Sequence, residues 1–191
     1  EMIMKEQTLD GVRQLLEGLG IDLEAQGMTD TPKRVATLFE SLFSGRDSTG
    51  KEALGDVYPT EHTGLVSVNH IPFYSICEHH LMPFYGKVHI VYQPRDGKVF
   101  GLGRLKALVD VFAKRPQLQE RFTHDIATSL VEDGDVLGAM VMVEATHLCM
   151  LMKGEVSQET VAKTIVATGM LEPMGVLREE ALVLLGGNDH V

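Results

Sequence analysis

The sequence predicts an α+β fold in which helices pack on one side of an antiparallel sheet. Apolar residues recur at helical spacing in several stretches and alternate with polar residues in others. The alternating stretches are joined by short connections such as Pro94-Arg95-Asp96-Gly97, and tight turns join antiparallel strands, whereas parallel strands need long crossovers. Strands also outnumber strand-helix-strand units, which favours the α+β class over the α/β class.

The N-terminal part is predicted to be helical. Four apolar residues repeat at helical spacing over 9–19, and a glycine follows them. A second helix is expected over 31–43, because Thr31 can cap a helix and Pro32 suits its first turn. The stretch 44–61 is rich in glycine and charge, which is typical of a connecting loop.

The rest of the chain alternates between strands and helices. Period-two alternation predicts strands at 64–71 and 84–93, on either side of a motif rich in cysteine and histidine. The other expected elements are a strand at 98–100, helices at 102–112 and 118–130, strands at 136–145 and 146–153, a segment at 160–169 that fits either a strand or a helix, and a helix at 177–185.

Composition limits the classes of partner. A chain of 191 residues with 44% hydrophobic residues can bury a core, and its formal net charge of −10 argues against general binding to nucleic acids or acidic membranes. No run approaches the ~20 apolar residues that cross a bilayer, so we expect a cytoplasmic protein. A sheet apolar on both faces in so small a chain predicts a homo-oligomer in which a second copy covers one face or edge.

The chemistry is predicted at Cys77-Glu78-His79-His80 and at the only other cysteine, Cys149, which lies close to His147. Two thiols and one imidazole suit zinc, and three protein ligands leave one coordination position open. In Cys77-x-x-His80 the first and last side chains can close on one ion across a turn, while the adjacent His79 points elsewhere. If 146–153 is a strand, alternation places His147, Cys149 and Lys153 on one face. The alternative is that both cysteines are small buried residues and the histidines belong to the core.

The segment from Ser75 to Gly86, which reads SICEHHLMPFYG, resembles the signature of the GTP cyclohydrolase I family. The segments Phe112 to Arg121 (FAKRPQLQER) and Thr146 to Met150 (THLCM) fit the same family in the same order. The resemblance begins near residue 30, with Asp30 to Ala36, and extends to Leu177-Arg178-Glu179-Glu180.

The resemblance implies a T-fold with an N-terminal helical arm, divided into an arm and loop at 1–60 and a catalytic domain at 61–191. It implies Zn²⁺ bound by Cys77, His80 and Cys149, with His79 and His147 handling protons. Gln119 and Glu120 fall where the family holds the guanine edge, and Arg104, Lys106, Lys153 and Arg34 are candidates for the phosphates. The implied assembly is a toroidal decamer, a dimer of pentamers, with sites between subunits.

The implied reaction is hydrolytic opening of the guanine imidazole ring of GTP, with loss of formate and reclosure to 7,8-dihydroneopterin triphosphate, which serves pterin or folate synthesis. The phosphate-binding part departs from the family pattern. Gly103, Ala107 and Lys153 stand where the family usually has serine, arginine and arginine, and lysine lacks the bidentate fork of arginine. Two alternatives therefore stay open: a paralogue acting on a guanine nucleotide or nucleoside with fewer phosphates, and a non-catalytic, zinc-stabilised protein that binds a pterin or a partner.

Overall fold

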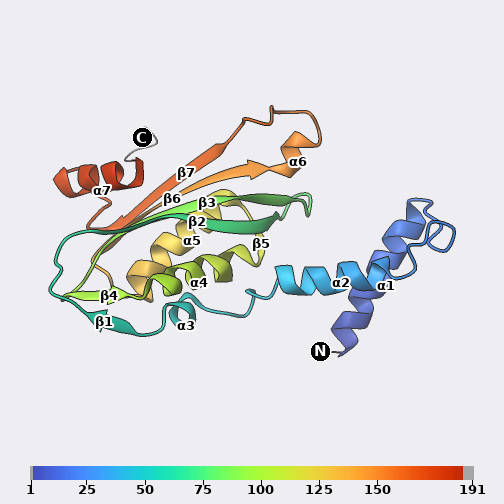
Figure 1. Ribbon diagram of the computed structural model, residues 1–191, viewed down its shortest axis with the longest axis horizontal. Helices are drawn as coiled ribbons and strands as arrows, with labels where there is room; N and C mark the ends of the chain where they lie inside the picture. The colour runs from blue at the N-terminus through green and yellow to red at the C-terminus, as the bar shows by residue number, and fades with distance from the viewer. Residues whose placement is uncertain (1, 187–191) are drawn as a thin grey trace. The chain divides into compact units, whose positions relative to one another are not determined.

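The computed structural model describes residues 2–186 (Figure 1). By its internal contacts the chain divides into two units, Glu1–Ser44 and Gly45–Val191. The first unit contains helices α1 (Met2–Gly18) and α2 (Thr31–Leu42), which pack against each other. Both helices confirm the predicted pattern, and Pro32 lies in the first turn of α2 as expected. The predicted division into an arm and loop at 1–60 and a catalytic domain at 61–191 stays a prediction.

The second unit is built on a five-stranded sheet with the strand order β5-β2-β3-β6-β7. All neighbouring pairs are antiparallel except β2 with the two-residue β5, which confirms the antiparallel prediction. The strands are β5 (Pro116–Gln117), β2 (Val66–Cys77), β3 (Pro83–Gln93), β6 (Gly138–His147) and β7 (Ala162–Gly169). The ambiguous segment at 160–169 is thus a strand.

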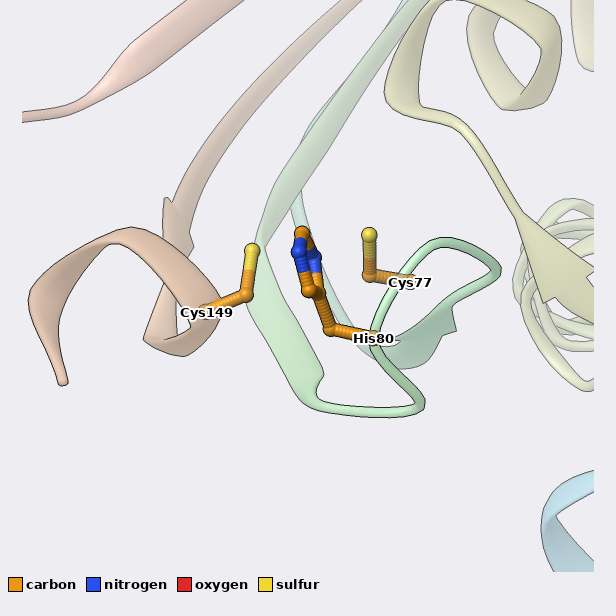
Figure 2. Close-up of side chains that lie close together, drawn as sticks. All are labelled: Cys77, His80 and Cys149. Carbon is orange, nitrogen blue, oxygen red and sulfur yellow. The ribbon is translucent and has the colours of Figure 1, made fainter. Parts of the chain in front are cut away.

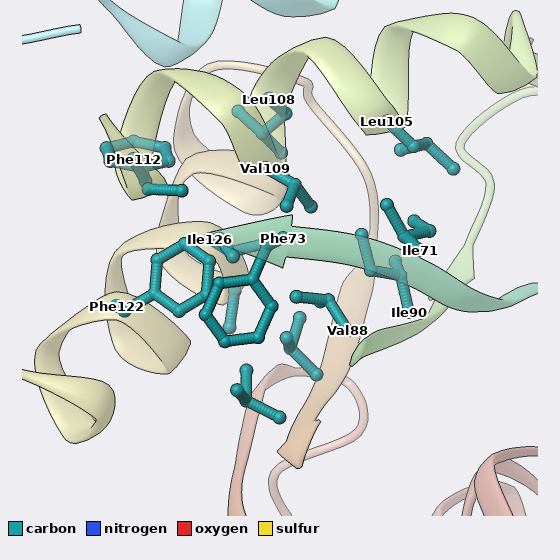
Figure 3. Packing of buried hydrophobic residues seen from close by; sticks show 14 of the residues in the cluster. Ile71, Phe73, Val88, Ile90, Leu105, Leu108, Val109, Phe112, Phe122 and Ile126 are labelled. Atoms are coloured by element: carbon teal, nitrogen blue, oxygen red, sulfur yellow. The ribbon is translucent and has the colours of Figure 1, made fainter. Parts of the chain in front are cut away.

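Helices α4 (Leu102–Ala113) and α5 (Gln119–Glu132) lie on one side of the sheet, as predicted (Figure 1). Their apolar faces, which include Phe122 of α5, form the main core with the inward residues of β2, β3 and β6, among them Phe73 and Val88 (Figure 3). The C-terminal helix α7 (Val176–Gly186) contacts the opposite face, where Ala181 and Leu185 pack with Val91 and Met140. One end of the second face is therefore covered within the chain.

The predicted loop at 44–61 contains two elements. Helix α3 (Gly50–Leu54) starts at a capping box in which Thr49 and Glu52 exchange side-chain and backbone hydrogen bonds. Strand β1 (Val57–Pro59) pairs with β4 (Lys98–Phe100) in a separate two-stranded sheet. The glycine and charged residues of this stretch favour a loop prediction, and the capping box formed by Thr49 and Glu52 was therefore not recognised in the sequence.

Strand β2 is longer than predicted because an irregularity resets its alternation. Between Val68 and Ile71 two residues of β2, Asn69 and His70, stand opposite one residue of β3, and His70 takes a φ of 61°. After this bulge Ile71 and Phe73 face the core, so the pattern appears broken in the sequence. Pro72 is tolerated because β5 pairs only with Ile76 and Cys77 and leaves the rest of that edge open.

The predicted strand at 146–153 is wrong. Strand β6 ends at His147, and Leu148–Leu151 form one helical turn, α6. Leucine and methionine favour helix, so local propensity supports this turn. His147, Cys149 and Lys153 therefore do not share the face of a strand.

A glycine allows the close approach of β3 and β6. A Cβ atom at Gly86 would lie 1.8 Å from the backbone oxygen of Glu144. No rotamer change relieves a clash with backbone, so one of the two strands would have to move.

We therefore expect Gly86→Ala to lower the free energy of unfolding by roughly 1–3 kcal/mol, the usual cost of overpacking. Gly103→Ala is the matched control, because a Cβ there meets no atom within 4 Å and the position is helical. Denaturant unfolding of both variants measures the difference, and equal midpoints would contradict the role of Gly86.

Candidate active site

Three potential metal ligands converge at one end of the sheet. Cys77 ends β2, His80 lies in the turn between β2 and β3, and Cys149 lies in α6 (Figure 2). One ligand atom from each lies within 4.8 Å of the others, which is close enough for all three to bind one ion. The Cys77-x-x-His80 spacing does close across a turn, as the sequence predicts.

The pairing of β3 with β6 brings the two cysteine segments together. In this register Phe84 lies opposite His147, so the turn that precedes Phe84 and the helix that follows His147 are neighbours. Backbone hydrogen bonds from Cys77 N to Met82 O and from Leu81 N to Cys77 O, both 2.9 Å, close the turn. Leu81 adopts a left-handed φ of 52°, which costs a non-glycine residue about 1–2 kcal/mol.

The thiols suit a cation. Burial raises the pKa of Cys149, and the neighbouring Cys77 thiol raises it further, because two thiolates so close together repel each other. A bound cation removes this penalty by pairing with the negative charge. Both cysteines are buried and free, while His80 is exposed at the open side of the cluster. The donor set therefore fits a thiophilic divalent metal such as zinc.

His147 lies beside the cluster in a defined orientation. Its ring stacks on Phe84 with a centroid distance of 4.8 Å and an interplanar angle of 3°. Its Nε2 lies 2.7 Å from Oε1 of Gln119. Burial lowers the pKa of His147, and the carboxylate of Glu120 partly opposes this shift, so the neutral imidazole is favoured near neutral pH.

A lysine and a second histidine face the same end of the sheet. Lys153 Nζ lies 3.0 Å from Nε2 of His80, so the turn after α6 places a positive charge next to the cluster. His79 is exposed, and the centroid of its ring lies 6.2 Å from that of His80. The two rings are in edge-on contact, and His80 but not His79 belongs to the cluster with Cys77 and Cys149.

The sequence matches the family model described as GTP cyclohydrolase I over residues 9–186. Curated relatives match it nearly from end to end. GTP cyclohydrolase 1 of Carboxydothermus hydrogenoformans is 44% identical over 97% of this chain and 96% of its own, and GTP cyclohydrolase 1 of Bacillus subtilis is 46% identical over 94% and 95%. The enzyme of that name from Bacillus mycoides is 45% identical over 96% and 97%.

This chain belongs to the GTP cyclohydrolase I family. Its fold, with helices α4 and α5 on one side of an antiparallel sheet, agrees with the T-fold expected for that family. None of the helices within residues 2–186 is long and apolar enough to cross a membrane.

The residues expected to hold substrate in a GTP cyclohydrolase I belong to several elements of both units. Glu120 lies near His147 in the first turn of α5 and is exposed. Gln119 is buried, and its amide contacts protein groups. Arg104 and Lys106 lie in the first turns of α4, about 10–14 Å along the helix from its end near β5. Arg34, in the first unit, pairs with Asp30 at 3.7 Å.

The supporting roles of Arg121 and Gln117 were missed by the sequence analysis. Arg121 donates to Oε1 of Gln117 at 2.9 Å and forms an ion pair with Glu78, and the backbone N–H of Glu78 donates to Gln117 O at 3.1 Å. These bonds tie the Cys77–His80 turn to β5 and α5. Charge alone does not separate Arg121 from other surface arginines, so no sequence signal could have found this contact.

We expect Arg121→Ala to weaken metal binding by about 10- to 100-fold, as loss of groups that orient ligands usually does. Competition with a chromophoric zinc chelator measures the affinity. Arg95→Ala is the control, because Arg95 makes a comparable ion pair with Asp135 at 2.9 Å away from the cluster. Equal zinc affinities in the two variants would contradict the bracing role of Arg121.

Proposed function

We propose that this protein is a zinc-dependent GTP cyclohydrolase I. It would open the imidazole ring of the guanine of GTP, release formate and reclose the product to 7,8-dihydroneopterin triphosphate. The observation that supports this most strongly is the meeting of Cys77, His80 and Cys149 beside His147. These groups come from two distant segments of a chain that matches the family over 9–186.

Cys77, His80 and Cys149 would hold the zinc ion. Purely structural zinc usually takes four protein ligands, and only these three cluster among the residues that the structure describes. When bound, zinc would polarise a water molecule and so supply a nucleophile near neutral pH. This arrangement favours a catalytic role for the metal over the alternative of a non-catalytic, zinc-stabilised binding protein.

His147 and His79 would handle the protons. Protonation of nitrogen 7 of the purine makes carbon 8 electrophilic. Addition of one water at carbon 8 and cleavage of one of its bonds to nitrogen leave a formamide, and hydrolysis of that formamide by a second water breaks the other bond and releases formate. Each cleavage needs a proton on the departing nitrogen, which histidine can deliver in the neutral pH range. The favoured neutral form of His147 lets it accept a proton before it returns one.

Glu120 would bind the guanine edge. A carboxylate accepts hydrogen bonds from the ring N–H and the exocyclic amine of guanine together. Its position in the first turn of α5 is close enough to His147 to affect that imidazole's pKa. A substrate held there would lie between α5 and the metal cluster.

Lys153 would meet the phosphates from the side of the cluster, while Arg104, Lys106 and Arg34 would contribute from a neighbouring copy. Lys106 pairs with Asp110 within α4. A homo-oligomer with shared sites would unite these groups, and we propose the decamer typical of the family. Several large apolar side chains are exposed in the single chain, including Tyr74 at 70%, Leu15 at 62% and Leu38 at 55%.

Light scattering of the purified protein tests the assembly. We expect a mass near ten times the 21.0 kDa of one chain. A monomer would contradict both the oligomer and the shared site. The proposed setting is the cytoplasm, where the product would enter pterin or folate synthesis.

The central experiment measures formate release and pteridine fluorescence with GTP, GMP and guanosine. We expect GTP to be turned over fastest. His147→Ala should abolish formate release and leave zinc bound, because His147 is not among the three clustered ligands.

Retained turnover in His147→Ala would remove this residue from the mechanism. Faster turnover of GMP or guanosine than of GTP would favour a paralogue whose substrate carries fewer phosphates. Lys153, Gly103 and Ala107, which depart from the family pattern, are the reason for testing this alternative. Zinc binding without turnover of any of the three would favour the non-catalytic alternative.

A further inference from the structure

The side chain of Gln119 is buried at the start of α5 and contacts four groups. Its amide nitrogen donates to Val143 O at 3.1 Å, to Ala162 O at 3.0 Å and to Thr164 Oγ1 at 3.2 Å. Its amide oxygen lies 2.7 Å from Nε2 of His147. Residues from α5, β6 and β7 thus meet at one amide.

These contacts allow only one orientation of the Gln119 amide. Exchanging its oxygen and nitrogen would place the oxygen against the carbonyl oxygens of Val143 and Ala162, where neither side has a proton to donate. Thr164 does not change this conclusion. Thr123 donates its hydroxyl proton to Gln119 O at 2.7 Å, so the 2.6 Å contact between the two threonines uses the proton of Thr164. The oxygen of Thr164 is left to accept from Gln119.

We propose that Gln119 is the positioning residue of His147: it fixes the proton on Nε2 and presents Nδ1 to the substrate. An amide oxygen can only accept, so the 2.7 Å contact requires His147 to donate from Nε2. The lone pair of the neutral ring then lies on Nδ1, for which the described part of the chain offers no hydrogen-bond partner. Stacking on Phe84 fixes the plane of the ring, and Gln119 fixes its rotation within that plane.

This inference rests on the proposed function for the role of His147 in turnover, and it changes the role expected for Gln119. A side chain whose two amide atoms are both engaged inside the protein acts on the purine through His147, and Glu120 alone of the pair faces outward. A misplaced proton-transfer group lowers the rate of the chemical step more than it weakens substrate binding.

The direct test needs no substitution at Gln119. In the zinc-loaded protein with ¹⁵N-labelled histidine, the His147 signals are assigned by their absence in His147→Ala. We expect a protonated Nε2 and an unprotonated Nδ1 in the neutral ring. A proton on Nδ1 would overturn the proposal. This readout does not depend on turnover, so it still decides the role of Gln119 if the protein releases no formate from GTP and the proposed function fails.

The kinetic test uses Gln119→Met, which keeps the length of the side chain and removes the amide. We expect kcat with GTP to fall about 10- to 100-fold with KM changed less than about twofold. Gln93→Met is the matched control, because Gln93 is also a buried glutamine that donates to backbone carbonyls, at the far end of β3. It should lose stability and keep kcat.

Three further outcomes would overturn the proposal. A raised KM with unchanged kcat in Gln119→Met would assign Gln119 to direct purine binding. An equal loss of kcat in Gln93→Met would assign the effect to stability. An unaltered ratio of the two ring tautomers of His147 in Gln119→Met would show that another group sets the proton.

Discussion

The antiparallel pairing of β3 with β6 is the constraint on which the site depends. Ten residue pairs define this register, from Phe84 opposite His147 to Gln93 opposite Gly138. A slip by one residue would turn every side chain of one strand to the other face, which would remove Phe84 from the core if β3 turned or Val143 if β6 turned. The core therefore determines the register, and the register places the helical turn of Cys149 next to the turn of His80.

The metal cluster is built where regular structure ends. Cys77 is the last residue of β2, and Cys149 lies in α6, two residues after the end of β6. The two thiols therefore lie at the same end of the sheet, within reach of His80. The cost is a turn with Leu81 in left-handed backbone and a buried thiol, Cys149, whose pKa is raised by burial and by the neighbouring Cys77. Arg121, Glu78 and the short strand β5 stabilise this turn from the other side.

The sequence predicts the parts that depend on local pattern and on chemically distinctive residues. Helices α4 and α5, strand β3 and the grouping of Cys77, His80 and Cys149 follow from periodicity and from the rarity of cysteine. It fails where tertiary contacts override the pattern. The bulge before Ile71 interrupts the alternation, so the second half of β2 could not be recognised from the sequence. The helical turn α6 replaces an expected strand, because the pattern of only four residues cannot distinguish a strand from a turn of helix.

The contacts that Gln119 and Arg121 make with other elements could not be predicted either, and the reason is a different one. Gln119 and Arg121 are polar residues of an amphipathic helix, and their partners Val143, Ala162 and Glu78 are 24, 43 and 43 residues away in sequence. Such contacts exist only after the sheet has formed, and two of the three use backbone groups, which every residue carries. In the proposed mechanism, proton-handling geometry would thus be a property of the assembled sheet: His147 would supply the imidazole, and the direction of its ring nitrogens would be set by the Gln119 amide, which residues of β6 and β7 hold in place.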